Sequence, residues 1–562
     1  MAELLTEPVP APRRKAPGSG RRGWSLVVLA VGAFVASPVL AVTVRALSQG
    51  GLDLPGGIGR MVLTTFGLLL GVAVGTGALG TGLAWLVTAY EFPGRRLLEV
   101  LLVLPMAMPA YILGFVFLST FDFAGPVQTA LRAQLGDGFG PLPVRSLAGA
   151  VAVMTLTLYP YVYLTVRAAF SELAPSAYDA ARTLGASRRR AFRTVLLPLA
   201  RPSLAAGLAL VMMETLTDFA TVQYFNVRTV SVGVYLAWKG SFDIGSAISV
   251  SVLVLLFAIG VLALERTFRG RARYAQRGGA GRGLGRRRLA GSRGWSATAA
   301  AGAVVAAAFV LPVARLATWA VEAAREDGVL TDERFGEHLS NSAAVAAVAA
   351  AACVVVALTM AHAERLGGGR LVSGAAQLTM VGYAVPGAVI GIGVLAAFQG
   401  LDRLLELLGV DGGTGLLATG SVLGILVAYV VRFTGPAYQA VDASFSRVPL
   451  SVTSSALTLG AGPLRVLTRV HLPLVRSGAA VAATLVLVDA VKELPLVLLL
   501  RPFGFTTLSV WVFELASENY WTRAALPALL IVALAVVPVA LLTTGRRPPG
   551  AADVDRSGGV VR

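Results

Sequence analysis

Four carboxylates inside long apolar segments are the residues of this chain best suited to chemistry. They form two pairs with a four-residue spacing, Glu214 with Asp218 and Asp489 with Glu493. That spacing places both members of a pair on one face of a helix. Carboxylate oxygens are the ligands that hard cations favour, so the four are candidate contacts for a charged species. The alternative is a structural role, because Lys492 neighbours Glu493 and could neutralise an acidic partner.

A repeated motif precedes each acidic pair. Thr-Leu-Gly-Ala is followed by Leu-Pro-Leu in both copies, with Gly185 and Pro198 in the first and Gly460 and Pro473 in the second. Both residues recur at an offset of 275 positions, and the acidic residues recur at the same offset. The chain therefore contains an internal repeat that covers a loop and the apolar segment after it.

The composition identifies the class of protein. The chain has 562 residues, of which 56% are hydrophobic and 14% charged, whereas soluble proteins carry about 25% charged residues. Apolar segments of about twenty residues or more suit membrane helices rather than barrel strands. The net charge of +18 falls mainly in the tails and alternate loops, so topology explains it better than binding to nucleic acid. One cysteine and three scattered histidines predict no disulfide framework and no stably bound metal.

The apolar segments predict an all-α integral membrane protein with about twelve transmembrane helices. A basic, Gly- and Arg-rich stretch at 266–294 separates two sets of six, which read as two parallel six-helix repeats. The expected spans lie near 24–46, 60–90, 97–119, 147–170, 203–225, 243–265, 295–320, 341–363, 371–399, 416–440, 477–500 and 522–543.

The distribution of basic residues predicts the orientation. The N-terminal tail, the linker and the C-terminal tail, with Arg546 and Arg547, are basic, and an even number of spans places all three on one side. By the positive-inside rule this side is cytoplasmic, and both repeated loops fall there too. The expected organisation is a tail at 1–23, a first domain at 24–265, the linker at 266–294, a second domain at 295–543 and a tail at 544–562.

The repeated loops are predicted to be cytosolic helical hairpins. In the first, a short amphipathic helix ends at Gly185, because glycine tolerates the left-handed turn that ends helices. Such a hairpin, rich in small residues, is suited to the groove of a partner protein. The alternative is an ordinary basic loop that only satisfies topology, but two matching copies at one offset argue against it.

The loops resemble the cytoplasmic EAA motif of ABC importer permeases: Glu-Ala-Ala, three residues, Gly, then Leu-Pro. The first copy, Asp179-Ala180-Ala181 with Gly185 and Pro198, has Asp for Glu. The second, Ser454-Ser455-Ala456 with Gly460 and Pro473, has no acidic residue and one extra residue before the glycine. The resemblance implies two permease domains with ATPase-coupling loops at about 171–202 and 444–476.

The resemblance also implies the partners. The chain has three lysines, none after a glycine, so it contains no Gly-x-x-x-x-Gly-Lys phosphate loop. It is therefore expected to be a transport subunit and not an enzyme, without a cofactor of its own. ATP and Mg²⁺ would bind to two copies of a cytoplasmic ABC ATPase. A periplasmic or lipid-anchored solute-binding protein and membrane lipid are the other expected partners.

The segments after the loops resemble the ferric-iron branch of fused permeases. The most specific parts are Lys492-Glu493-Leu494-Pro495 and the stretch Thr507–Trp521. The resemblance implies import of Fe(III) across a bacterial inner membrane by alternating access, with the four carboxylates as candidates for the translocation pathway. Thiamine or a phosphonate are alternative cargoes. An ion-coupled secondary transporter, with the acidic pairs as its relay, is a more distant alternative.

Overall fold

The computed structural model describes residues 18–136, 140–172, 175–241, 243–269, 285–326, 332–366, 369–415 and 420–544. Most of the expected N-terminal tail, most of the linker and the C-terminal tail with Arg546 and Arg547 lie outside the described residues.

The described chain is almost entirely helical, as the sequence predicts. Eleven of its helical stretches are long and apolar enough to cross a membrane. A further long helix, α19 (Leu423–Phe445), packs on α15, α16 and α22 in the second half, and it carries a buried arginine, Arg432. The prediction of an all-α membrane protein with about twelve spans is confirmed.

The first half of the chain contains α1 (Gly18–Ser48), α2 (Ile58–Ala89), β1 (Tyr90–Glu91), α3 (Arg95–Leu101), η1 (Leu104–Ala107), α4 (Ala110–Phe121), α5 (Pro126–Leu135), α6 (Leu147–Glu172), α7 (Pro175–Thr183), α8 (Arg188–Ala191), η2 (Phe192–Leu196), α9 (Leu197–Thr217), α10 (Phe219–Tyr224), α11 (Val230–Ser241) and α12 (Ile244–Arg269).

The second half contains β2 (Arg287–Arg288), α13 (Ser292–Val305), η3 (Ala306–Val310), α14 (Leu311–Glu326), α15 (Glu333–Arg365), α16 (Arg370–Ala384), α17 (Gly387–Leu407), α19, α20 (Leu450–Thr458), α21 (Pro463–Val466), η5 (Leu467–His471), α22 (Leu472–Lys492), α23 (Pro495–Leu500), α24 (Leu508–Ser517) and α25 (Trp521–Thr544).

Four of the predicted spans are interrupted helices rather than continuous ones, including the one at 477–500, where α22 ends at Lys492 and α23 begins at Pro495. The span expected at 97–119 breaks before α4 and the one at 371–399 breaks before α17. Pro109 and Pro386 lie at these breaks and have the same extended backbone geometry. The φ and ψ angles are −57° and 137° at Pro109, and −55° and 137° at Pro386. Proline lacks the amide hydrogen that would continue the preceding helix. The span expected at 203–225 ends at Thr217.

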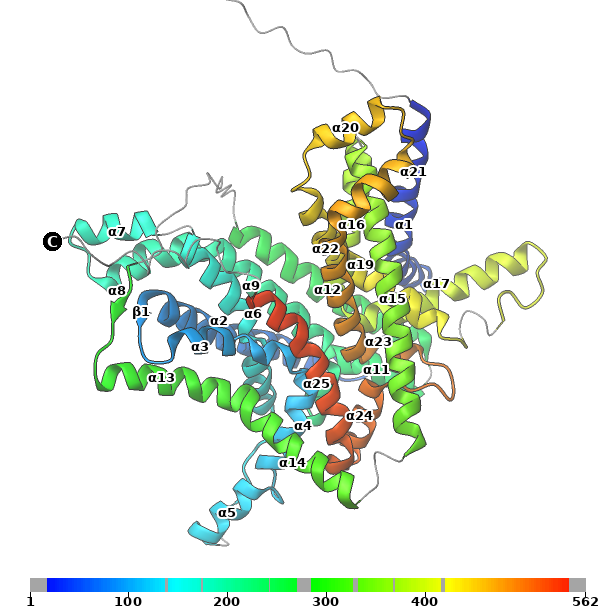
Figure 1. The fold of residues 1–562 in the computed structure, drawn as a ribbon. Helices are drawn as coiled ribbons and strands as arrows, with labels where there is room; N and C mark the ends of the chain where they lie inside the picture. The colour runs from blue at the N-terminus through cyan, green and yellow to red at the C-terminus, as the bar shows by residue number, and fades with distance from the viewer. Residues whose placement is uncertain are drawn as a thin grey trace, which may run out of the picture.

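The first helix of each half packs on the other half. Helix α1 lies along α16 and α17, whereas α13 contacts α3 and α14 contacts α4 (Figure 1). Glycine permits this close approach, because a Cβ at Gly393 would lie 2.4 Å from the carbonyl oxygen of Pro38. The two halves therefore form one interlocked body.

A short parallel strand pair adds a second link between the halves. Strand β2, at the end of the linker, pairs with β1, and the amide of Leu289 donates to the carbonyl of Glu91 at 2.8 Å. The Thr298 hydroxyl donates to the Pro93 carbonyl at 2.6 Å. The described end of the linker is therefore fixed to the turn after α2.

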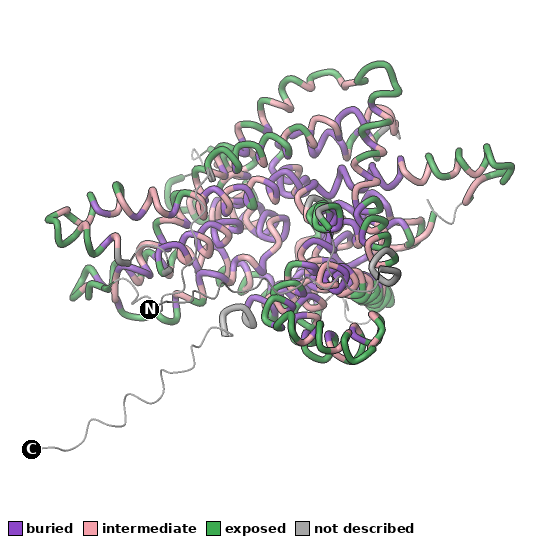
Figure 2. The backbone as a smooth tube through the Cα atoms, turned by 90° about the horizontal axis from the view of Figure 1, so that it is seen from above, coloured by how far each residue is buried: buried purple, intermediate pink, exposed green. Residues whose placement is uncertain are grey.

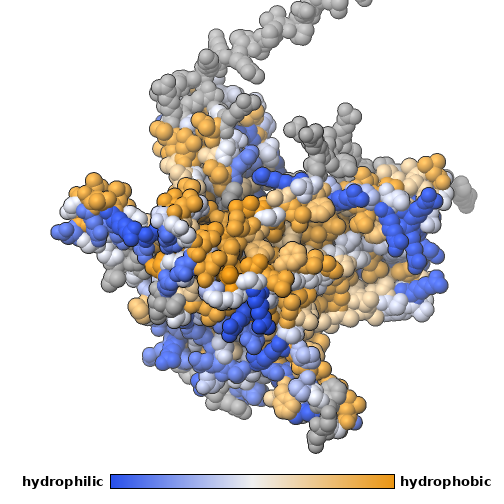
Figure 3. Space-filling view, turned by 180° about the vertical axis from the view of Figure 1, so that it is seen from behind, coloured by the Kyte–Doolittle hydropathy of each residue, from blue (hydrophilic) through white to orange (hydrophobic). Residues whose placement is uncertain are grey.

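The outer surface is that of a membrane protein. Buried residues gather at the centre of the molecule and exposed residues at its projecting ends (Figure 2). A broad hydrophobic area crosses the middle of one face, and hydrophilic clusters lie towards its edges (Figure 3). Helix α2 exposes Leu63, Phe66, Leu70 and Val74 along one side, a stripe at helical spacing that suits contact with lipid.

Candidate translocation cavity and coupling loops

The four carboxylates predicted from the sequence line a single cavity between the two halves. Its volume is about 110 Å³. Glu214 and Asp218 enter from the end of α9, and Asp489 and Glu493 enter from the end of α22. Two segments 275 residues apart therefore meet at one place, as the internal repeat predicts.

The second carboxylate of each pair caps a helix break, so the expectation that each pair lies along one continuous helix is wrong. Asp218 ends α9 and begins α10, where its carboxylate accepts the Thr221 amide at 2.9 Å. Glu493 ends α22 and accepts the Leu496 amide at 3.3 Å. Aspartate favours the N-cap position, and Pro495, two residues after Glu493, has no amide hydrogen with which to continue α22.

The two halves differ in how their carboxylates are paired. Lys492 Nζ lies 2.7 Å from Asp489 Oδ1, and Arg432 Nε lies 3.5 Å from Glu493 Oε2. Among the described residues, neither Glu214 nor Asp218 has a cationic partner within ion-pair distance. The second pair of carboxylates therefore has cationic neighbours, and among the described residues the first pair has none.

Other residues of the cavity were not identified from the sequence. Arg432, Tyr111, Tyr161 and Tyr383 also line it. Arg432 is 4% exposed, and an arginine within a predicted span is a signal of function that hydropathy alone conceals. The tyrosines carried no comparable signal. In the part of the chain that the structure describes, no three Asp, Glu, His or Cys side chains are grouped closely enough to hold a metal ion.

The two repeated loops have the same backbone geometry. Gly185 and Gly460 adopt left-handed conformations, with φ +87° and φ +82°. The next residue donates its amide back across the turn in both copies, Ala186 to Ala181 at 3.0 Å and Ala461 to Ala456 at 3.1 Å. These bonds are those of a Schellman helix end, which explains why both copies retain glycine.

A wide helical turn follows each loop. The π-helical segments η2 and η5 end two residues before Pro198 and Pro473, directly before the Leu-Pro pair, and η3 likewise precedes a Leu-Pro pair. Proline has no amide hydrogen and its ring clashes with the carbonyl four residues earlier, and the wider π turn relieves that crowding. The repeated Leu-Pro motif therefore produces a repeated local distortion at the start of α9 and α22.

The tip of each loop exposes a leucine. Leu184 is 89% exposed and Leu459 is 88% exposed, and α7 and α20 project at separate corners of the molecule (Figure 1). Asp179 and Ser454, the matching positions at which the second motif copy lacks the acidic residue, are both exposed. A leucine in water at a projecting loop is a candidate contact for a partner protein.

The inner sides of the loops are packed differently. Tyr178 of α7 is buried against the ring of Trp85, with 5.9 Å between ring centroids. At the matching position in α20, the Thr453 hydroxyl bonds His471 Nε2 at 2.9 Å, and His471 Nδ1 lies 2.8 Å from His362 Nδ1. The first loop rests on an aromatic cluster and the second on a buried polar one.

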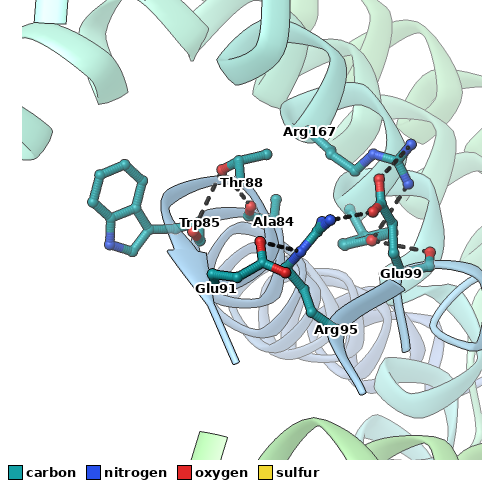
Figure 4. Close-up of polar contacts among 8 residues, drawn as sticks. Ala84, Trp85, Thr88, Glu91, Arg95, Glu99 and Arg167 are labelled. Atoms are coloured by element: carbon teal, nitrogen blue, oxygen red, sulfur yellow. Dashed lines mark hydrogen bonds and ion pairs between the residues drawn. The ribbon is translucent and has the colours of Figure 1, made fainter. Parts of the chain in front are cut away.

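A charged network joins α3 to α6, the helix that precedes the first loop. Arg95 is 5% exposed and bonds Glu91 at 2.9 Å and Glu99 at 2.8 Å (Figure 4). Glu99 also lies 3.3 Å from Arg167 of α6. Helix α6 contributes Thr157, Leu158 and Tyr161 to the cavity and leads directly towards α7. The network therefore fixes α6, which runs from the cavity towards the first repeated loop.

Comparison with known proteins identifies the family. Residues 67–274 and 353–545 match the family model of the binding-protein-dependent transport system inner membrane component. The chain is 25% identical over 528 residues to the Fe(3+)-transport system permease protein FbpB 2 of Haemophilus influenzae, covering 92% of this chain and 97% of that protein. It is 33% identical over 198 residues to the sulfate transport system permease protein CysT of Salmonella typhimurium, covering 33% and 69%. It is 32% identical over 162 residues to the molybdenum transport system permease protein ModB of Escherichia coli, covering 28% and 69%. This chain therefore belongs to the family of inner-membrane components of binding-protein-dependent transport systems.

Proposed function

We propose that this chain is the fused permease of a bacterial ATP-driven importer of Fe(III). The observation that carries the proposal is the cavity in which the four carboxylates of the two halves meet. Fe(III) is a hard cation that favours oxygen ligands. The similarity to an Fe(3+)-transport permease along 92% of the chain supports the same cargo.

The proposed architecture is two six-span permease domains, at 24–265 and 295–543, joined by the linker at 266–294. Both termini and both coupling loops lie in the cytoplasm. Two contacts support a common side. The start of α1 lies beside the second loop, since the rings of Trp24 and His362 are 4.8 Å apart. The end of the linker pairs with β1, whose Tyr90 contacts Trp85 under the first loop.

The proposed mechanism is alternating access. Closure of an ATPase dimer would draw the two coupling loops together through their exposed leucines. Helices α6 and α19, which line the cavity and lead to α7 and α20, would transmit this movement. The cavity would then open towards a solute-binding protein, and its free carboxylates would receive the cargo. ATP and Mg²⁺ act on the ATPase subunits, so this chain contributes no covalent chemistry.

Each candidate residue has a role in this mechanism. Gly185 and Gly460 shape the loop ends, and Pro198 and Pro473 set the wide turns after them. The motif residues are proposed to face the ATPase: Asp179, Ala180 and Ala181 in the first loop, and Ser455 and Ala456 in the second. Glu214 and Asp218 are proposed to contact the cargo directly, whereas Asp489 and Glu493 hold Lys492 and Arg432.

A second candidate cargo is an oxyanion. Two of the relatives named above transport sulfate and molybdenum, and the buried Arg432 lines the cavity. Guanidinium is well suited to oxyanions. Four carboxylates against two cationic groups in the cavity favour the metal, because a free anion would meet net negative charge.

The test is uptake by cells that lack this chain, with and without a restored copy. We expect chain-dependent accumulation of ⁵⁵Fe under iron limitation and none of ³⁵S-sulfate or ⁹⁹Mo-molybdate. Sulfate or molybdate uptake that depends on the chain, with iron uptake unchanged by its loss, would replace the proposed cargo and leave the family assignment intact.

A further inference from the structure

Two buried side chains that line the cavity have hydrogen-bond donors without a hydrogen-bond partner among the described residues. They are Tyr111, through its hydroxyl, and Arg432, through Nε and Nη1. Tyr111 is 5% exposed and Arg432 is 4% exposed. A buried donor left without an acceptor is costly, and most such groups in native proteins are paired. These donors are therefore free to bind a species with acceptor oxygens in the cavity.

The surroundings of these donors suit negative charge. Tyr111 lies in the first turn of α4, a 12-residue helix whose N-terminus has no side-chain cap. The amides of such a terminus attract anions. Arg432 keeps a free side even though its Nε faces Glu493. Gly387 preserves the space there, because a Cβ at this position would lie 3.0 Å from Nη1 and 3.1 Å from Glu493 Oε1.

The carboxylates of the cavity suit positive charge. Glu214 and Asp218 lack cationic partners among the described residues, as shown above, and both line the same cavity as Tyr111 and Arg432. One cavity thus offers acceptors to a cation and donors to an anion. Two free carboxylates balance only two of the three charges of Fe(III), and a small oxyanion would supply the remaining negative charge.

We propose that the cargo passes through the cavity as a metal–oxyanion complex. Fe(III) faces Glu214 and Asp218, and an oxyanion bound to it, a phosphate or a carboxylate, accepts from Tyr111 and Arg432. The cavity has room for such a complex of several atoms. One water needs about 10–15 Å³ by the same kind of measure, and the cavity has about 110 Å³. The inference rests on the proposed function, because it assumes that the cation is iron.

The decisive variant is Tyr111→Phe. The hydroxyl bonds no described residue, so its removal takes no hydrogen bond from the fold. The matched control is Tyr159→Phe, whose buried hydroxyl donates to the Leu102 carbonyl at 2.9 Å and does not line the cavity. A second variant, Arg432→Lys, keeps a cation beside Glu493 and removes the guanidinium donors.

The experiment is transport by the complete complex in proteoliposomes, in carbonate-free buffer. The solute-binding protein is loaded with ⁵⁵Fe and either ³²P-phosphate or ¹⁴C-citrate, and both labels are counted in the lumen after ATP is supplied. We expect one of the anions to enter with iron at a ratio near one. Tyr111→Phe and Arg432→Lys should each slow entry of both labels about tenfold, the loss typical of one hydrogen bond to a charged group. Tyr159→Phe should leave the rate and the ratio unchanged.

Three results would overturn the proposal while leaving iron transport in place. The first is iron entry with neither anion. The second is wild-type transport by both Tyr111→Phe and Arg432→Lys, which would mean that these donors face only water. The third is an equal loss in Tyr159→Phe, which would indicate a general effect of hydroxyl removal. If ATP raised ⁵⁵Fe entry through the wild type no higher than the background without ATP, the proposed function itself would be overturned.

Discussion

The exposed leucines at the tips of the coupling loops give a quantitative prediction for ATPase docking. Leu184 is 89% exposed and Leu459 is 88% exposed, so Leu→Ala at either position removes no packing from the permease. If the ATPase buries the side chain, the variant loses about 0.8 kcal/mol per carbon removed. Three carbons are removed, so each variant should lose about 2 kcal/mol of binding free energy, a weakening of about thirtyfold or more.

The assay is equilibrium binding of the purified ATPase to the detergent-solubilised permease. The matched control is Leu407→Ala at the end of α17, where the side chain is 85% exposed and belongs to neither loop. We expect Leu184→Ala and Leu459→Ala to weaken binding to a similar extent, because both loops have the same backbone geometry. A Kd equal to that of the wild type in both loop variants would refute docking through these leucines, and an equal change in Leu407→Ala would show that the effect is not specific.

Two further predictions concern loop geometry and charge pairing. Gly185→Ala should destabilise the loop by about 1–2 kcal/mol, because the φ of Gly185 is +87°, and it should lower ATP-driven uptake about fivefold or more. The control is Gly82→Ala, which adds a methyl group in open space within α2 and should leave uptake unchanged. Equal uptake by the two variants would contradict the strain argument. Lys492→Met should lower the unfolding free energy by about 2 kcal/mol, because it leaves Asp489 unpaired; breaking a fully buried pair costs roughly 3–5 kcal/mol. In a thermal melt, the double variant Lys492→Met/Asp489→Asn should recover stability. A double variant no more stable than Lys492→Met would mean that the pair does not act as a unit.

The internal repeat allowed the candidate functional elements to be located from the sequence. A shared offset of 275 residues relates the two loops to each other and the two acidic pairs to each other. The structure places the carboxylates in one cavity and gives both loops the same glycine turn. Local chemistry decides such features, since a left-handed glycine and a Leu-Pro distortion depend on neighbouring residues alone.

Long-range packing decided the features that the sequence did not predict. Hydropathy averages over a window, so it hid the breaks at Pro109 and Pro386 inside predicted spans. The pairing of Arg432 with Glu493 joins α19 to the end of α22, and no local pattern specifies that contact. For the same reason the difference between the free first pair and the neutralised second pair is visible only in the fold.

The difference between the coupling loops is likewise a property of packing. The two motif copies differ where Asp179 is replaced by Ser454, yet both residues are exposed and neither is buried beneath its loop. The buried support differs instead, with Trp85 beneath α7 and His471 beneath α20. A comparison of motif residues alone would therefore place the asymmetry at the wrong positions.

The most direct test of the central claim is ATP-driven ⁵⁵Fe uptake by the reconstituted complex with Glu214→Gln or Asp489→Asn. We expect Glu214→Gln to reduce uptake at least tenfold, because it removes a carboxylate without a cationic partner from the cavity. We expect Asp489→Asn to have the smaller effect, because Lys492 already neutralises Asp489. Wild-type uptake by Glu214→Gln, at unchanged protein stability, would contradict the claim that the first-half carboxylates contact the cargo.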